Sequence, residues 1–205
     1  MSALPTPSRS FHCLRHGVTD WNRQGLFQGR TDNLLNEDGL KQAHEAARLL
    51  RDVGISRIVA SPLLRAARTA EIIADAISVP LAIDDGIIEF DFGSFEGLPV
   101  RDLMIKHGVN SATGLVSILP ANGESWDAMT ERSLACVSAW LDRHPGDNLL
   151  FVCHDAVMQG MANALCGSYF KNSHGTPFRY VREQAQWRIE QVAIAGRYSP
   201  SPPAT

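Results

Sequence analysis

The sequence predicts an α/β fold, a three-layer α/β/α sandwich in which a mostly parallel central sheet carries helices on both faces. The main observation is that short apolar runs of strand length alternate with longer runs whose apolar residues recur at helical spacing. A second observation is that no internal repeat is evident. The 205 residues suit one domain, whose core can bury roughly 70% of the surface of the unfolded chain.

The first strand and helix follow from residues 11–50. Residues 11–14 are apolar enough to form a strand, which ends at the polar pair Arg15–His16. Asn36 is a predicted helix cap, because its side chain can accept a backbone N–H and two acidic residues follow it. Apolar residues then recur at helical spacing as far as Leu50.

The next elements lie between residues 57 and 88. Residues 57–60 form a second short strand. Ser61 followed by Pro62 predicts the start of a helix that continues to about Ile77, because a capping hydroxyl then precedes proline at the first helical position. Two apolar pairs between Leu81 and Ile88 predict further extended chain.

The last elements begin at a long amphipathic helix over residues 125–143. The run LLFVC, residues 149–153, predicts a buried strand. Asp155 can cap a helix over residues 156–165, and residues 187–195 alternate enough to form a late strand.

Composition and charge exclude several classes of function. A formal net charge of −3 gives no electrostatic basis for binding nucleic acid or an anionic membrane surface. No apolar run reaches the roughly 18 residues of a membrane span, and the N-terminus lacks the apolar core of a secretion signal. Four cysteines without motif spacing suit buried thiols in a reducing compartment, which predicts a cytoplasmic protein.

Residues 10–196 are predicted to form the single domain. Residues 1–9 and the Ser/Pro-rich tail at 197–205 are predicted to be flexible extensions. Residues from about 98 to 122 mix glycine, small polar and apolar residues. We expect this segment to form a cap over the cleft and to take part in substrate selection.

Three predicted strand ends carry the candidate site. In α/β sheets, ligands bind at the carboxyl ends of strands, and here those ends lead to Arg15–His16, to the helix with Arg65 and to His154. Free N–H groups at a helix start and guanidinium forks both suit phosphate oxygens. We therefore expect a phosphate pocket that includes Arg15 and Arg65. A strand end with a solvated charge is the plainer alternative.

A metal site is a second interpretation, since histidine and cysteine ligands are available in Cys13, His16, Cys153 and His154. Successive strand residues point to opposite faces, however, so we expect the cysteines to face the core. The arginines would also repel a divalent cation. We therefore expect no metal and no cofactor. Positive neighbours instead favour a neutral His16, which can act as a nucleophile toward a phosphoryl group.

Four blocks, LRHGVTDWN, SPLLRAARTAEI, EFDFGSFEG and VCHDAV, resemble the histidine phosphatase superfamily, the phosphoglycerate-mutase-like proteins. They stand in the family's order, each at a predicted strand end or helix start, and the resemblance covers residues 11–195. It implies that His16 becomes a phosphohistidine and that Glu89 protonates the leaving oxygen. The residues that it implies for phosphate or substrate binding are Arg15, Asn22, Gln28, Arg65 and His154.

The acid and the second histidine need comment. The residues alone leave Glu89, Asp91 and Glu96 open as the acid, and the resemblance favours Glu89. The family commonly has serine before the second histidine and two glycines after it, whereas this chain has Cys153, Asp155 and Ala156. We expect Asp155 to cap the following helix rather than to point into the site.

The resemblance favours a phosphatase that acts on a small phosphorylated metabolite without a metal. Mutases of the superfamily usually carry an arginine pair in a longer insert, while residues 98–122 hold only single basic residues, and residues 122–125 resemble the phosphatase branch. Phosphoglycerate mutase-type transfer is the alternative. An inactive module that binds a phospho-ligand or a protein is an alternative of another class, although a binder needs neither nucleophile nor acid. The resemblance allows a monomer or a homodimer.

Overall fold

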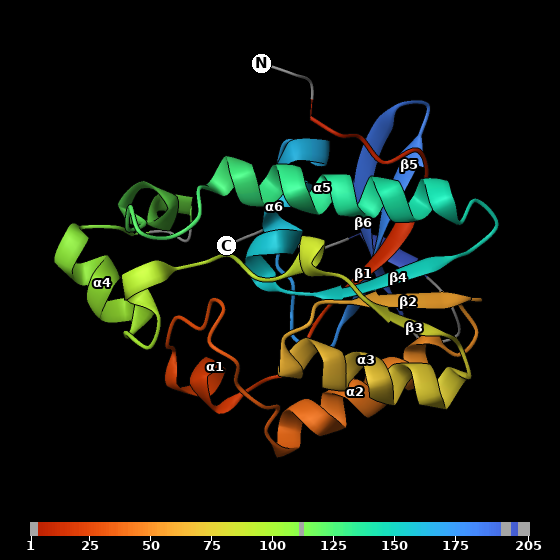
Figure 1. The fold of residues 1–205 in the computed structure, drawn as a ribbon, viewed down its shortest axis with the longest axis horizontal. Coiled ribbons are helices and arrows are strands. Elements are labelled where there is room, and N and C mark those ends of the chain that lie inside the picture. The colour runs from red at the N-terminus through yellow and green to blue at the C-terminus, as the bar shows by residue number, and fades with distance from the viewer. Residues whose placement is uncertain (1–3, 111–112, 194–197, 201–205) are drawn as a thin grey trace.

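A seven-stranded sheet forms the centre of the computed structural model, which describes residues 4–110, 113–193 and 198–200. The strand order is β3-β2-β4-β1-β5-β6-β7 (Figure 1). The strands are β1 (Phe11–Arg15), β2 (Arg57–Ala60), β3 (Leu81–Ile83), β4 (Leu149–Cys153), β5 (Pro177–Glu183), β6 (Gln186–Val192) and β7 (Tyr198–Pro200).

The four strands β3, β2, β4 and β1 are parallel neighbours. Their register pairs Arg15 with Cys153 and Ala60 with Val152, so that the carboxyl ends of β1, β4 and β2 lie side by side. The other three strands add an antiparallel half, in which β5 pairs with β1 and β6 follows it. The predicted α/β class is confirmed, with a sheet that is mixed rather than parallel throughout.

Helices cover both faces of this sheet and make three layers (Figure 1). One face carries α2 (Glu37–Leu50) and α3 (Leu64–Ile77), and the other carries α5 (Trp126–Arg143) and α6 (Asp155–Cys166). Two separate clusters of buried apolar residues fill the two interfaces. The short helices α1 (Asp20–Gln24) and α4 (Val100–His107) lie to one side of the layered core, beside the 3-10 turns η2 (Gly93–Phe95) and η3 (Thr113–Ile118).

Two helix starts differ from the prediction. The helix α3 begins at Leu64 after Leu63, whose apolar side chain makes no capping bond. The Ser61 hydroxyl contacts His154 Nε2 (2.6 Å) and accepts from the Leu63 N–H (3.4 Å), ahead of the helix. Arg65 therefore lies in the first turn of α3. In α6 the capping position is His154, and Asp155 is the first helical residue, so the expected capping role of Asp155 is wrong.

Parts of both predicted extensions contact the domain in the described residues. Ser8 donates to Asp142 Oδ1 (3.0 Å) and Arg9 donates to the carbonyl oxygen of His144 (2.7 Å), so this part of the N-terminal segment contacts the end of α5. Tyr198–Pro200, within the predicted tail, pairs with β6 as an edge strand. Residues 1–3, 194–197 and 201–205 lie outside the described residues. No described helix is both long enough and apolar enough to span a bilayer.

Candidate active site

A cavity of about 570 Å³ lies at the carboxyl ends of the parallel strands. It is lined by six of the seven residues predicted for the site: Arg15, His16, Asn22, Gln28, Arg65 and Glu89. The seventh, His154, is fully buried directly beside His16, with 5.2 Å between the two ring centroids. The structure therefore brings all seven predicted residues together.

His16 is held in one tautomer by its own neighbour. Its backbone N–H bonds to Cys153 of β4 (3.1 Å), and its Nδ1 lies 2.7 Å from the carbonyl oxygen of Gly17. A carbonyl oxygen only accepts, so Nδ1 carries the proton and Nε2 keeps its lone pair. Burial and the nearby Arg65 hold the pKa of His16 well below its usual range. The ring is therefore neutral, with a nucleophilic nitrogen at the cavity.

Gly17 is required by a close approach of two chain segments. A Cβ on Gly17 would collide with the carbonyl oxygen of Gly39, at the start of α2. The Gly17 N–H donates to the Thr69 hydroxyl on α3 (3.1 Å). These contacts fix the position of Gly17, whose carbonyl oxygen orients His16.

Arg65 is a fully buried cation that faces the same nitrogen. Its Nε donates to His16 Nε2 (3.2 Å), and its two terminal nitrogens donate to the carbonyl oxygens of Thr31 (2.9 Å) and Gly29 (2.7 Å). Within the described part of the chain, Arg65 makes no ion pair with a carboxylate. A buried charge with neutral partners is costly, and an anion at the cavity would compensate it.

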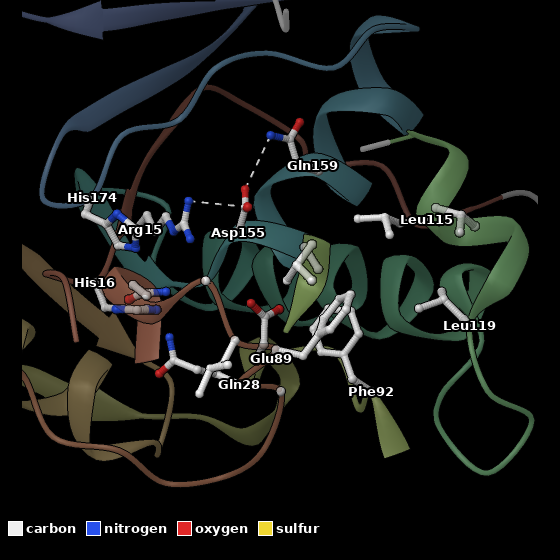
Figure 2. A pocket seen from close by; sticks show the side chains of 18 of the residues that line it. Arg15, His16, Gln28, Glu89, Phe92, Leu115, Leu119, Asp155, Gln159 and His174 are labelled. Atoms are coloured by element: carbon white, nitrogen blue, oxygen red, sulfur yellow. Dashed lines mark hydrogen bonds and ion pairs between the residues drawn. The ribbon is translucent and has the colours of Figure 1, made fainter. Parts of the chain in front are cut away.

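Arg15 is the second guanidinium of the site. Its Nη1 lies 3.3 Å from Asp155 Oδ2 and donates over 3.4 Å to Asn172. Asp155, which we expected to point away, therefore points toward the site and partly neutralises Arg15 (Figure 2). Asp155 is the first residue of α6, directly after His154, and from there its side chain reaches Arg15 at the end of β1.

The His154 ring is oriented by a hydrogen bond to the Ser61 hydroxyl. Its Nε2 lies 2.6 Å from the Ser61 hydroxyl, and burial together with Arg65 lowers the pKa of the ring well below its usual range. A neutral imidazole has a single N–H. When the Ser61 hydroxyl donates to Nε2, that N–H is at Nδ1, the ring atom that has no other partner in the structure.

Glu89 is a buried carboxyl group of the cavity, which Asp155 also lines. Only 6% of its surface is exposed, and this burial raises its pKa to about 7, with Arg65 acting in the opposite direction. Of the other two candidates for the acid, Asp91 accepts from the Gly93 N–H, and Glu96 accepts from the N–H groups of Arg30 and Thr31. Neither lines the cavity, so the structure favours Glu89.

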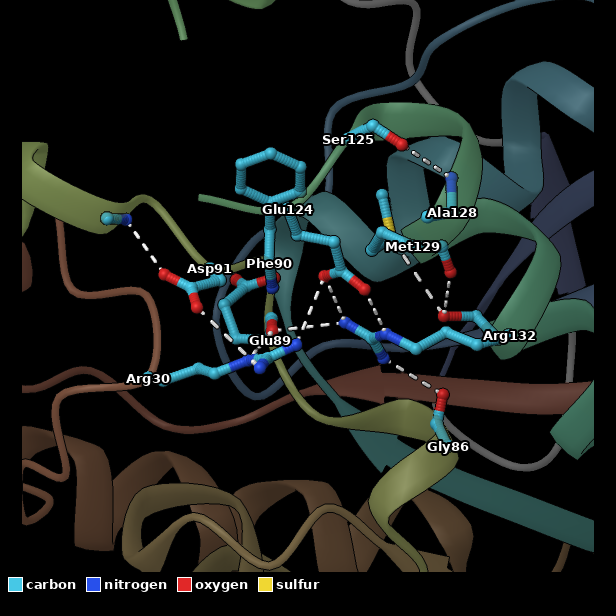
Figure 3. Close-up of polar contacts among 12 residues, drawn as sticks. Arg30, Gly86, Glu89, Phe90, Asp91, Glu124, Ser125, Ala128, Met129 and Arg132 are labelled. Carbon is cyan, nitrogen blue, oxygen red and sulfur yellow. Dashed lines mark hydrogen bonds and ion pairs between the residues drawn. The ribbon is translucent and has the colours of Figure 1, made fainter. Parts of the chain in front are cut away.

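The chain around Glu89 is fixed through its backbone (Figure 3). Arg132 of α5 donates to the carbonyl oxygens of Glu89 (3.1 Å) and Gly86 (3.0 Å). Glu124 holds Arg132 by two contacts of 2.7 and 2.8 Å and also pairs with Arg30 (3.3 Å). The backbone of Glu89 is thereby anchored to α5 by groups that do not contact its carboxyl. That carboxyl lines the cavity and accepts at Oε1 from the Phe90 N–H (2.8 Å).

Sequence reasoning missed two residues of the site, Asn172 and His174. Both lie in the loop before β5, a strand that the sequence analysis did not predict. The His174 ring centroid is 5.5 Å from that of His16, and burial together with Arg15 lowers its pKa to about 3. The run Asn-Ser-His-Gly before an alternating apolar stretch was the available signal.

Unpartnered polar atoms gather around His16. Six buried side-chain nitrogen or oxygen atoms in the described residues lack a hydrogen-bond partner. Four of them belong to this site: Arg15 Nε, His154 Nδ1, Asn172 Nδ2 and His174 Nε2. Such atoms are rare in folded proteins and normally have a partner, so they mark the place of an acceptor-rich ligand such as a phosphoryl group.

The metal interpretation finds no support in the site. Cys13 and Cys153 lie in the apolar core beneath α5 and α6, while His16 lines the cavity and His154 is buried beside it. Among the described residues, no group of three or more His, Cys, Asp or Glu side chains could hold a metal ion. Metal independence itself stays a prediction for experiment.

Comparison with known proteins agrees with this geometry. Residues 11–186 match the family model of the histidine phosphatase superfamily (branch 1). A Bacillus subtilis protein described as the uncharacterized phosphatase PhoE is 35% identical, over 91% of this chain and 96% of the relative. A Yersinia pestis protein described as the probable phosphoglycerate mutase GpmB is 33% identical, over 76% and 74%.

A solved structure supports the fold. The mycobacterial glucosyl-3-phosphoglycerate phosphatase in complex with VO3 aligns with a TM-score of 0.75 at 23% identity, covering 89% of this chain and 97% of that one. Together with the match of the family model over most of the chain, these findings establish that the protein belongs to the histidine phosphatase superfamily, branch 1.

Proposed function

We propose that this protein is a phosphomonoester hydrolase that works through a phosphohistidine on His16, with Glu89 as general acid and base. The observation that carries the proposal is the state of His16. Its Nδ1–H is bound to the Gly17 carbonyl oxygen, so Nε2 keeps its lone pair, which accepts from Arg65 Nε at a cavity that Glu89 also lines. For attack by Nε2, the Arg65 N–H must turn from this nitrogen to an oxygen of the phosphoryl group. The nucleophile His16, the cation Arg65 and the proton donor Glu89 thus line the same cavity.

In the first step, His16 Nε2 attacks phosphorus and the bond from phosphorus to the ester oxygen breaks. Arg65 and Arg15 stabilise the charge on the transferring group, and His154 donates a hydrogen bond to it. Glu89 gives its proton to the departing oxygen, which leaves as an alcohol. A carboxyl whose pKa burial raises to about 7 still holds that proton near neutral pH.

In the second step, water attacks the phosphorus of phosphohistidine. Glu89, now ionised, accepts a proton from that water. The bond from phosphorus to nitrogen breaks, its electron pair returns to His16 Nε2 and inorganic phosphate is released. Each group is then back in its initial state, and no step calls for a metal ion.

Mutase-type transfer within phosphoglycerate is the alternative, because one relative is described as a probable phosphoglycerate mutase. The two reactions differ in whether water reaches the phosphohistidine. Release of inorganic phosphate therefore separates them.

The test compares wild type with His16→Ala on p-nitrophenyl phosphate and a panel of phosphorylated metabolites that includes 3-phosphoglycerate. Phosphate release and product identity are both measured. His44→Ala, which removes an exposed histidine of α2, is the matched control. We expect His16→Ala to retain less than about 1% of the activity and His44→Ala to retain all of it. Conversion of 3-phosphoglycerate without phosphate release would instead identify a mutase.

A further inference from the structure

The active-site cavity has two chemically different ends (Figure 2). Arg15, His16 and His174 lie at one end, which we call the phosphate end. Arg65 and His154, the direct neighbours of His16, also belong to it. Phe92, Leu115 and Leu119 lie at the other. We call that second end the apolar wall and define it by six lining residues: Phe27, Phe92, Leu115, Val116, Leu119 and Trp126.

The apolar wall is built from separate segments that pack on the core. The Phe92 ring packs at a tilt against the rings of Phe27 and Phe90, with centroid distances of 4.7 and 4.9 Å. Trp126 and Leu119 pack against the buried cluster beneath α5. Leu115, Val116 and Leu119 are all half-buried and come from the segment that we expected to cap the cleft. The wall is thus backed by fixed side chains and still faces the cavity.

The charges of the cavity do not suit a second anion. Arg15 and Arg65 are the only arginine or lysine side chains among the described lining residues. Arg15 is part of the phosphate end, and Arg65 donates to His16 there. The other charged lining residues, Glu89 and Asp155, are acidic. Arg30 and Arg132 lie nearby but are paired with Glu124, and neither lines the cavity.

We propose that the apolar wall binds the alcohol part of the substrate, and that the enzyme selects phosphomonoesters of alkyl or aryl alcohols that carry no carboxylate and no second phosphate. This inference rests on the proposed phosphatase activity. Burial of each methylene against such a wall is worth about a fourfold gain in kcat/KM, and a carboxylate there would lose its hydration without gaining a cation.

A homologous series of primary alkyl phosphates tests the proposal. Ethyl, butyl and hexyl phosphate leave as alcohols of nearly equal acidity, so differences in kcat/KM report contacts rather than proton transfer. We expect kcat/KM to rise at least about tenfold from ethyl to hexyl phosphate. 3-Phosphoglycerate has an alcohol of the same heavy-atom count as hexyl phosphate, and we expect it to be the poorest substrate. A flat series, or a preference for 3-phosphoglycerate, would overturn the proposal.

Two variants test whether the dependence of kcat/KM on alkyl chain length arises at the apolar wall. Leu119→Ala truncates the apolar wall and should lower the hexyl-to-ethyl ratio of kcat/KM by roughly threefold to tenfold. Ile105→Ala removes an apolar side chain of α4 that is 69% exposed and does not line the cavity, so the ratio should stay at the wild-type value. Equal ratios in both variants would mean that the wall does not contact the substrate.

Binding of phosphonates separates failure of this inference from failure of the proposed function. Phosphonates cannot be hydrolysed, so calorimetry with ethylphosphonate, hexylphosphonate and 2-carboxyethylphosphonate needs no turnover. If no ester is hydrolysed but hexylphosphonate binds tightest, the hydrolase proposal falls and the apolar wall remains. If the carboxylated ligand binds as tightly as hexylphosphonate, the apolar wall is not the selecting surface, whatever the activity.

Discussion

The phosphate end and the apolar wall of one cavity are built in opposite ways. His16, His154 and Arg65 come from the ends of strands or the first turn of a helix, and hydrogen bonds hold each of them. The apolar wall comes from loops, from the cap segment and from the start of α5, and its side chains are held by packing. The strand ends and the first turn of α3 thus supply the hydrogen-bonded polar groups of the cavity, while the connecting segments supply its apolar surface.

The comparison predicts that losses at the phosphate end exceed those at the apolar wall, and the largest should follow Glu89→Gln. Glutamine keeps the size of the side chain but cannot give a proton to the leaving oxygen. We expect kcat/KM for hexyl phosphate to fall by about 10²–10⁴. The loss for p-nitrophenyl phosphate should be much smaller, because its leaving group is stable as an anion. Equal losses for the two substrates would contradict the assignment of Glu89 as the acid.

Arg65→Lys is the next test, since it keeps the charge and removes the planar fork. Lysine cannot donate to His16 and to the carbonyl oxygens of Gly29 and Thr31 at once. We expect kcat/KM to fall by about 10²–10³ for ethyl and hexyl phosphate alike. Circular dichroism checks that the variant folds. If Arg65→Lys lowered kcat/KM no more than Leu119→Ala does, the prediction that the phosphate end contributes more to catalysis than the apolar wall would be wrong.

Stability should depend on pH through Glu89. Its pKa is raised by burial to about 7, above the value of 4.5 for an unperturbed glutamate, so the folded state binds the proton more tightly than the unfolded state. The stabilisation is complete below pH 4.5 and is lost as pH rises to about 7. It amounts to about 3 kcal/mol.

Urea unfolding of wild type and Glu89→Gln measures this contribution. Between pH 5 and pH 8, the free energy of unfolding of the variant should change less than that of wild type, by about 2–3 kcal/mol. The inactive variant should therefore gain stability relative to wild type at pH 8. Parallel pH dependences would show that the carboxyl of Glu89 is already ionised in the folded protein at pH 5.

The smallest effect is expected from Asp155→Asn. The carboxylate of Asp155 pairs with Arg15 and, by its charge, raises the pKa of Glu89. Its removal should tighten inhibition by inorganic phosphate by roughly threefold to tenfold, because Arg15 loses a competing anion. The alkaline limb of the activity profile should move to lower pH, because Glu89 then loses its proton more readily. Unchanged phosphate inhibition would mean that Arg15 does not contact the phosphoryl group.

Much of the phosphate end could be predicted from the sequence, because strand ends are local features. Apolar runs that stop at Arg15–His16 and at His154 indicate side chains that leave the core at one edge of a sheet. The same reasoning was wrong for Ser61 and Asp155. Both had the side chain expected of a helix cap, but neither is the capping residue of its helix. Ser61 contacts His154, which follows β4, and Asp155 pairs with Arg15 at the end of β1.

The sequence by itself determined the alternation of strands and helices, the parallel half of the sheet and the family's site residues, since these depend on apolar spacing and on short motifs. Only the tertiary structure decided which carboxyl faces the cavity, which tautomer His16 adopts and that His174 joins the site. It also formed the apolar wall. The physical reason is that burial, desolvation and hydrogen-bond partners come from residues far apart in the chain, which local patterns do not report.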